Sequence, residues 1–363
     1  MSDVVFILGA GASVDCGGPL MFNFLDIATD LYKAGKISKE GQDHYARVFE
    51  IIGNLQEAHS KAQLDLNNIE SIFTVFELGK IIQKLPGTPK NEIPQAIASL
   101  KEVIVRTLEA KIRFPFRDGR ILAPNTYQAF AKLLKHIHDD SHPKTSVSVI
   151  TFNYDIAIDV AMSNVGFQPN YRFEPKSGPI DLMKLHGSLN WATEIGEKKI
   201  IRPISMGDYL SKFNRIDGIP KSITIPIGSA HLGEYFRDHA PEKPIQVHPE
   251  PVIVPPSWNK ADYHQALSNV WAAAAEHLSN AESIFVIGYS LPQTDSFFRH
   301  LYALGSVGKR PLRRFIVFDP DKEGGGVDQR FRSLLGSGAM TRYQYIEREF
   351  GPALEFIGSF FPK

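Results

Sequence analysis

The amino-acid sequence predicts an α/β protein: a Rossmann-like, doubly wound parallel sheet with a large helical insertion and a small irregular lobe, and no zinc ribbon. Three observations lead to this fold class. Short runs of consecutive apolar residues, rich in β-branched side chains, are widely spaced along the chain. Helical patterns separate these runs, and glycine or polar residues follow their ends. Such runs are typical of strands buried on both faces of a parallel sheet, and their alternation with helices favours a doubly wound fold.

Five segments are expected to form the strands of this sheet. Each is short and apolar and leads into a turn. In chain order, the predicted strands are Val4–Leu8, Val147–Phe152, Leu182–His186, Ser283–Gly288 and Arg314–Asp319. A helix over Asp262–Ala281 is expected to lead into the fourth strand.

The rest of the single domain, residues 1–363, divides into two regions of different character. Residues 22–138 form the helical insertion, because apolar side chains recur there at helical spacing, for example at Ile69, Ile72 and Phe76. Residues 191–260 form the irregular lobe, since prolines interrupt this region repeatedly. They include Pro220, Pro226, Pro241, Pro244, Pro249, Pro251, Pro255 and Pro256.

Charge and cysteine content exclude several classes of protein. The chain has 40 basic and 40 acidic residues, so it shows no electrostatic footprint for nucleic acid and no polybasic run for an anionic membrane. Its one cysteine, Cys16, can form neither an internal disulfide nor a four-thiolate zinc site. No apolar stretch has the length of a membrane span. We therefore expect a soluble, cytoplasmic protein.

A glycine-containing loop, Gly9-Ala10-Gly11-Ala12-Ser13, follows the first predicted strand. Glycine permits a sharp turn and close approach of a ligand, and the amides that begin a helix suit a phosphate. Ser13 can add its hydroxyl to such a site or cap the helix. The loop is not a full dinucleotide fingerprint, because Val14 stands where the third glycine belongs. Alone, the loop indicates either a phosphate site or a plain strand-to-helix turn.

Polar residues also follow the second predicted strand. Asn153 offers a donor and an acceptor, and Asp155 offers a carboxylate for ribose hydroxyls. Side chains at the carboxyl end of a parallel strand face the crevice in which α/β proteins bind ligands. For Asp155 the alternative interpretation is that it caps a helix starting at Ile156.

The other strand ends carry residues of similar kinds. His186 follows an apolar strand and precedes a glycine, and imidazole titrates near neutral pH, so it is either a general base or an ordinary packed histidine. Gly288 and Ser290 follow the fourth strand, and Asp319 ends the fifth. Several polar strand ends that converge on one crevice are harder to explain by packing than any one of them. The sequence therefore predicts a ligand site at this edge of the sheet.

Taken in order, these motifs resemble the sirtuin family: a Gly-Ala-Gly-x-Ser loop, then Thr-x-Asn-x-Asp, a strand ending in His-Gly, and Gly-x-Ser. The chain is most similar to the sirtuin-like NAD hydrolases of bacterial anti-phage defence. Three segments look like signatures of that branch, namely Leu185–Ser188, Pro255–Lys260 and Val286–Asp295. The resemblance extends from Val4 to about Asp321.

The resemblance implies a role for each candidate residue. The pyrophosphate of NAD would be cradled by Gly9, Ala10, Gly11 and Ser13. The nicotinamide ribose and its attacking nucleophile would be held by Asn153 and Asp155, with His186 as the general base. The adenosine ribose would contact Gly288 and Ser290, and Asp319 would lie near the adenine side. NAD is then a substrate, and we expect neither a further cofactor nor a metal.

The sequence departs from the protein deacylases at two places. No zinc-binding cysteine lies between His186 and Gly288, and Leu20-Met21-Phe22 replaces the Asp-Phe-Arg of the deacylases. The leading hypothesis is therefore a hydrolase that cleaves NAD to nicotinamide and ADP-ribose and depletes cellular NAD as a gated defence effector. The alternatives are a non-catalytic NAD or ADP-ribose sensor and, less favoured, a deacylase or ADP-ribosyltransferase. The missing third glycine disfavours an ordinary dehydrogenase.

Gating is expected because a free NAD hydrolase would be toxic. The helical insertion is the candidate region for covering the pocket or for building an oligomer contact. Within it, Asn67–Phe73 places polar groups beside an apolar helical face, and a helix cap followed by core residues is the favoured interpretation. We expect a homo-oligomer, and the resemblance suggests a HerA-type ATPase or another defence protein as a partner.

Overall fold

The computed structural model describes residues 2–58, 64–141, 144–176, 178–196, 200–207, 210, 222–225, 246–248, 250–254, 261–293, 295–305, 308 and 310–362. Its centre is a six-stranded sheet in the order β13-β12-β11-β1-β4-β5, and every neighbouring pair of strands is parallel. The strands are β1 (Val4–Leu8), β4 (Val147–Thr151), β5 (Asp181–Lys184), β11 (Ser283–Ile287), β12 (Arg314–Asp319) and β13 (Tyr343–Glu347). The predicted Rossmann-like, doubly wound α/β fold is confirmed.

All five predicted strands are present, and the sixth, β13, was not predicted. Residues of β1, β4 and β11 are buried throughout, which is why their apolar runs are continuous in the sequence. β13 lies at the sheet edge and only its central Tyr345 is buried. An edge strand with exposed side chains has no continuous apolar run, so the criterion used for the other strands does not detect it.

Helices cover both faces of the sheet. On one face α5 (Asn125–Asp140) contacts β4, α6 (Ala157–Asn164) packs on α5, and α13 (Phe350–Gly358) packs on α5 and β12. On the other face α10 (Ser296–Gly305) and α11 (Gly326–Leu334) pack through Tyr302 and Phe331 on Phe315 of β12. The helix predicted before the fourth strand is α9 (Ala261–Asn280), which contacts β5 and α10. A short helix, α12 (Ser337–Met340), precedes β13.

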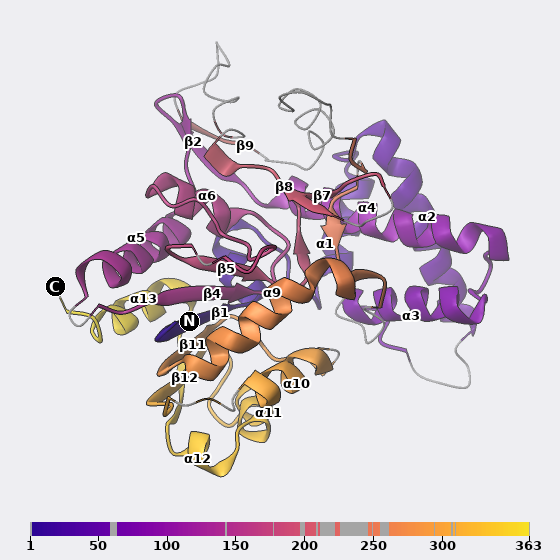
Figure 1. Ribbon diagram of the computed structural model, residues 1–363. Helices are drawn as coiled ribbons and strands as arrows, with labels where there is room; N and C mark the ends of the chain where they lie inside the picture. Colours follow the sequence, from indigo (N-terminus) through magenta and orange to yellow (C-terminus); the bar gives the residue numbers. More distant parts are fainter. Residues whose placement is uncertain are drawn as a thin grey trace.

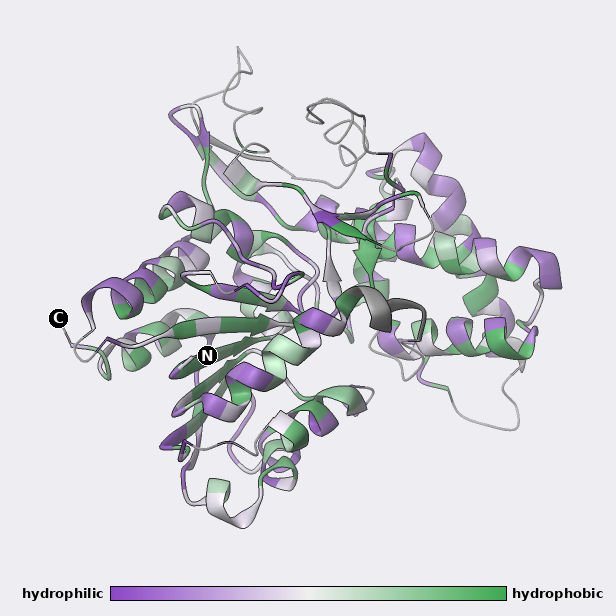
Figure 2. Cartoon of the chain, viewed as in Figure 1, coloured by the Kyte–Doolittle hydropathy of each residue, from purple (hydrophilic) through white to green (hydrophobic). Residues whose placement is uncertain are grey.

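The helical insertion contributes a group of helices that stands apart from the sheet (Figure 1). This group consists of α1 (Phe24–Lys33), α2 (Lys39–Ala58), α3 (Ile69–Ile82) and α4 (Ile93–Lys111), with a 3₁₀ turn, η2 (Lys90–Glu92), before α4. α4 is its centre, since α1, α2 and α3 all pack against it. The helices of this group alternate between apolar and polar residues, whereas the sheet strands are mainly apolar (Figure 2). The group therefore has its own apolar interior, continuous with the core of the sheet.

The remaining strands are short and antiparallel. β2 (Phe114–Arg117) pairs with β3 (Arg120–Ile121) and with β9 (Ser222–Ile225), β6 (Gly187–Ser188) pairs with β10 (Val252–Ile253), and β7 (Trp191–Thr193) pairs with β8 (Ile201–Pro203). Much of the predicted irregular lobe lies outside the described residues, including all but Pro251 of its named prolines and the whole of the signature Pro255–Lys260. Among the helices that the structure describes, none is long and apolar enough to cross a membrane.

Candidate functional site

A cavity of about 620 Å³ lies at the carboxyl edge of the sheet. From β1 the chain moves outward to β4 and β5 on one side, and later from β11 to β12 and β13 on the other. The reversal falls between β1 and β11, and open α/β sheets bind ligands at such a switch point. The volume lies within the range typical of small-molecule sites.

Two walls enclose this cavity. The strand-end wall is formed by residues that follow β1, β4, β5 and β11 and by the last residue of β12: Ala10, Gly11, Ser13, Asn153, Asp155, His186, Gly288, Ser290 and Asp319. The helical wall is formed by α3, α4 and their ends: Asn68, Ile69, Glu70, Phe73, Ile104, Leu108 and Ile112. The structure thus brings every predicted site residue except Gly9 to one cavity.

The glycines of the N-terminal loop serve a contact between two loops. A Cβ on Gly9 would lie 2.5 Å from the Cα of Tyr289, and one on Gly11 would lie 2.7 Å from the Cα of Gly288. The Gly11 N–H donates to the Gly288 carbonyl at 2.8 Å, so this amide is already paired. From the sequence, glycine at these positions is expected to allow close approach of a ligand. In the structure the two glycines let the loop after β1 pack directly on the loop after β11.

Ser13, Asn153 and Asp155 form one buried hydrogen-bonded cluster. The loop after β1 continues as a 3₁₀ helix, η1 (Ala10–Cys16), and Ser13 within it donates to the Asp155 carboxylate at 2.7 Å. The Asn153 Nδ2 group donates to the Gly9 carbonyl at 2.9 Å and to the Ser13 hydroxyl at 3.1 Å. The hydroxyl of Tyr127 lies 2.9 Å from that of Ser13. Ser13 therefore ties the first strand end to the second instead of capping η1, whose N-cap is Gly9.

Asp155 contacts the start of α6 and also lines the cavity. Its Oδ1 accepts the backbone N–H of Ala157, the first residue of α6, at 2.9 Å, whereas the N-cap of that helix is Ile156, which has no side-chain cap. Burial raises the pKa of the Asp155 carboxyl, against the opposing effects of the Lys184 charge and of the hydrogen bonds from Ala157 and Ser13. Lys184 is fully buried and donates to the Asp155 carbonyl at 2.5 Å and to Asp159 at 2.9 Å. Lys184 therefore fixes the backbone that follows β4 from the protein interior.

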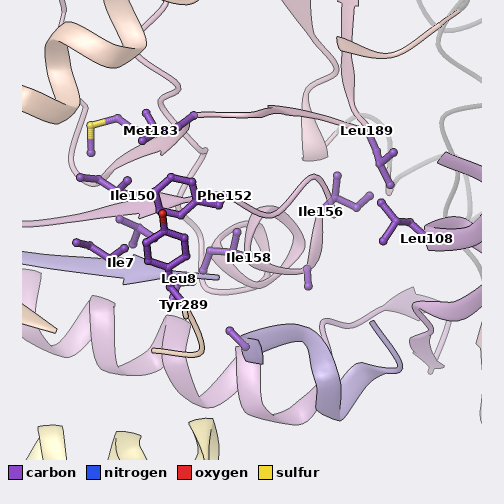
Figure 3. Close-up of a cluster of buried hydrophobic side chains, with 14 of the residues drawn as sticks. Ile7, Leu8, Leu108, Ile150, Phe152, Ile156, Ile158, Met183, Leu189 and Tyr289 are labelled. Atoms are coloured by element: carbon purple, nitrogen blue, oxygen red, sulfur yellow. The ribbon is translucent and has the colours of Figure 1, made fainter. Parts of the chain in front are cut away.

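His186 lies two residues beyond β5, among aromatic rings and beside a carboxylate. Its ring meets the edge of Phe152, with centroids 5.1 Å apart, and Phe152 stacks on Tyr289 at 4.0 Å, as Figure 3 shows for these two rings. His186 Nε2 lies 3.6 Å from Asp295 Oδ2, and both side chains are buried. An imidazole in this position can take up a proton beside a fixed negative charge.

The far end of the strand-end wall carries Gly288, Ser290 and Asp319. The Ser290 carbonyl accepts the Arg330 guanidinium N–H at 2.7 Å. Burial raises the pKa of Asp319, opposed by its hydrogen bond from the Asp321 N–H. Arg348 also lines the cavity at this end of the sheet. Asp319 and Arg348 therefore bring an acidic and a basic side chain to this end of the cavity.

The helical wall is mostly apolar. Asn68 caps α3 by accepting the N–H of Glu70 at 2.9 Å, and Ile69 and Phe73 are buried in the core, as the favoured interpretation of this segment required. Asn68, Glu70 and Phe73 also line the cavity. The Glu70 side chain is 8% exposed, so the helical wall places one carboxylate among apolar side chains.

Four residues of the site were not selected from the sequence. Tyr127 lies on α5, Lys184 ends β5, Glu70 is the second residue of α3, and Asp295 follows β11 by eight positions. Lys184 is a single charged residue within a predicted strand and Tyr127 lies within the helical insertion, so neither carries a local signal of a site. Asp295 stood in the Val286–Asp295 signature, so its place in a motif was visible while its contact with His186 was not.

Within the described residues, no group of three or more histidine, cysteine, aspartate or glutamate side chains could hold a metal ion.

No family model and no curated protein matches the sequence. Solved structures with a similar course of the chain include a Sir2 homologue in complex with NAD, at 13% identity and TM-score 0.43, covering 98% of this chain and 88% of the other. Another is a Sir2 homologue in complex with 2′-O-acetyl-ADP-ribose, at 14% identity and TM-score 0.42, covering 98% and 90%. These values are too low to assign a family, and the functional argument rests on the site.

Proposed function

We propose that this protein is a sirtuin-like NAD hydrolase that cleaves the bond between nicotinamide and ribose. One observation carries the proposal: Asn153, Asp155 and His186, which follow two different strands, line one cavity with the loop Ala10–Ser13 at the switch point of a parallel sheet. An elongated dinucleotide suits a cavity that follows the ends of five strands. The ordered motifs that resemble the sirtuins point to the same substrate.

For this cleavage the protein mainly has to position the attacking water and the ribose. Nicotinamide leaves with the electron pair of the C1′–N bond, a cationic charge develops on the ribose, and the oxygen of a water molecule bonds to C1′. The water proton passes to His186, a general base of the kind that contributes about 100- to 10,000-fold in rate. The Asp155 carboxyl stabilises the developing cation.

Asn153 is assigned the orientation of the attacking water or of a ribose hydroxyl. Both N–H bonds of its amide are directed to Gly9 and Ser13, so the acceptor oxygen is the group that remains for the substrate. Because these contacts also fix the amide plane, the oxygen has a defined direction before NAD binds. Such preorganisation is what a positioning mechanism needs.

The biological role that fits this activity is depletion of cellular NAD by a gated effector of anti-phage defence. Because continuous NAD cleavage would kill the cell, such a hydrolase must have an inactive resting state. The helical wall is the part of the site that can alter access, since it closes the cavity opposite the strand ends. We extend the proposal to a homo-oligomer and to a HerA-type ATPase or another defence protein as the partner that releases the activity.

The test is incubation of the purified chain with NAD, alone and with the product of its neighbouring gene, with and without an acyl-lysine peptide. Chromatography then measures NAD, nicotinamide and ADP-ribose. The proposal expects equal release of nicotinamide and ADP-ribose without peptide. Release only with peptide would indicate a deacylase, and binding of NAD without cleavage in every mixture would indicate a sensor.

A further inference from the structure

A buried carboxylate faces the proposed general base. Asp295 Oδ2 lies 3.6 Å from His186 Nε2, and the two side chains are 1% and 6% exposed. Both residues line the cavity. At this separation, and with so little water around the pair, the negative charge acts strongly on the imidazole ring. A carboxylate beside one ring nitrogen favours the tautomer that carries its proton there.

The position of this carboxylate is fixed by a second contact. The Tyr289 hydroxyl donates to the same oxygen, Asp295 Oδ2, at 2.7 Å. Burial and the adjacent Asp295 charge raise the pKa of Tyr289 well above its ordinary value, so the phenol stays protonated and donates. Its ring is stacked on Phe152, which in turn contacts His186. The base and its carboxylate are thus braced by the same pair of rings.

The backbone between Tyr289 and Asp295 is also specialised. Leu291 has a φ of +50°, a left-handed conformation that a branched apolar side chain rarely adopts. The Asp295 N–H then donates to the Pro292 carbonyl at 3.1 Å, which closes a turn. Strained backbone of this kind persists where the surrounding structure requires it, often at functional sites. The turn delivers the carboxylate to His186.

We propose that Asp295 is the positioning residue for His186: it holds the ring proton on Nε2 and stabilises the imidazolium that forms when Nδ1 accepts the proton of the attacking water. The proposal rests on the NAD hydrolysis proposed above. In the step, the water O–H bond breaks, its oxygen bonds to C1′, nicotinamide leaves with its electron pair, and the proton stays on Nδ1. Asp295 itself exchanges no atom.

The experiment uses the full chain labelled with ¹⁵N-histidine. The ring nitrogen signals of His186 are identified as those absent from His186→Gln, at a pH where the imidazole is neutral. The wild type is expected to show Nε2–H as the dominant tautomer, and Asp295→Asn is expected to shift the population toward Nδ1–H. Tyr289→Phe should shift it in the same direction but less, because the carboxylate remains and loses one hydrogen bond.

Steady-state kinetics provide the second readout. Asp295→Asn should lower kcat about 10- to 100-fold, as loss of an outer partner of a functional histidine does, with KM changed less than about threefold. The matched control is Tyr302→Phe, the same substitution on a tyrosine that packs on Phe298 and does not line the cavity. It should change neither the tautomer nor the rate.

An unchanged tautomer in both Asp295→Asn and Tyr289→Phe would overturn the proposal, whatever the rates. A loss of rate through KM alone would do so as well, because it would place Asp295 in substrate binding. If the wild type releases no nicotinamide, the hydrolase proposal fails, while the tautomer signals still decide whether Asp295 positions the ring.

Discussion

The two walls of the cavity differ in how they are built. The strand-end wall carries polar groups such as Asn153, Asp155 and His186, each within four residues of the end of a buried strand. The helical wall presents side chains such as Phe73, Ile104 and Leu108, which are also part of the apolar core. This difference indicates that the chemical groups are placed on the rigid edge of the sheet, whereas the helices determine the shape of the cavity. Substitutions in the strand-end wall should therefore change the rate of the reaction, whereas those in the helical wall should change stability and substrate binding.

The largest effect is expected from the strand-end wall. His186→Ala and Asn153→Ala should each lower the rate of nicotinamide release at least ~100-fold, because one loses the proton acceptor and the other the group that orients the attack. Release is measured by chromatography under identical conditions. His300→Ala, an exposed histidine on α10, serves as the control and should keep the wild-type rate. Wild-type turnover in His186→Ala would remove the base from the mechanism.

A second substitution tests the buried ion pair that supports the strand-end wall, between Lys184 and Asp159. Lys184 and Asp159 are both fully buried and lie 2.9 Å apart. Lys184→Met leaves Asp159 as an uncompensated buried charge, which typically costs about 3–5 kcal/mol in the free energy of unfolding. Urea unfolding followed by circular dichroism measures this loss. A change below ~1 kcal/mol would mean that the ion pair does not hold this strand end.

The opposite, amino end of the sheet provides a reference region away from the cavity. Burial alone would raise the pKa of Asp181, but hydrogen bonds from His277, the Gly178 N–H and Arg172 outweigh it and lower the pKa to about 2. A carboxyl whose pKa is lower in the folded than in the unfolded protein stabilises the fold at pH values above its unfolded-state pKa of about 3.9. This stability is lost as the pH falls toward the folded-state pKa of about 2.

We expect ~1–2 kcal/mol of stability to be lost through Asp181 between about pH 4 and pH 2. Urea midpoints measured across this range should fall less steeply in Asp181→Asn, which is less stable than the wild type at neutral pH. An identical slope in both proteins would contradict the assignment. Affinity for ADP-ribose at neutral pH should not change, because Asp181 does not line the cavity.

The smallest effect is expected from the helical wall. Ile104→Val removes one methylene group from α4 and should lower stability by about 0.5–1.5 kcal/mol. Because Ile104 lines the cavity, KM for NAD should rise while kcat stays near the wild-type value. Ile150→Val in β4 removes the same group from a buried strand that does not reach the cavity, so it should lower stability alone. A larger effect on kcat than on KM in Ile104→Val would show that the helical wall takes part in the chemistry.

The two walls also differ in how far the sequence predicts them. The strand-end wall follows from a local signal, since polar residues after continuous apolar runs must meet at one edge of a parallel sheet. Asn153, Asp155 and His186 were selected in this way. The helical wall depends on how helices pack, and periodicity shows that Phe73 is buried without showing that it borders a cavity.

Contacts between residues far apart in the sequence could not be predicted either, because sequence patterns report only on neighbouring residues. The close approach of Gly11 to Gly288 joins loops separated by most of the chain, and it gives these glycines a purpose other than ligand contact. The pairing of His186 with Asp295 arises from a strained turn, which propensities do not reveal. Strand β13 was missed for a different reason, because its exposed side chains interrupt the apolar run.

The most direct test of the central claim, that the strand-end wall directs water onto the ribose of NAD, is cleavage in water enriched with ¹⁸O. Mass spectrometry of the products then reports which nucleophile formed the new bond. If the wall acts in this way, the wild type gives nicotinamide together with ADP-ribose that carries one heavy oxygen, and His186→Ala gives both products at least ~100-fold more slowly. Intact NAD, or an ADP-ribosyl group transferred to a protein side chain without heavy oxygen, would contradict it.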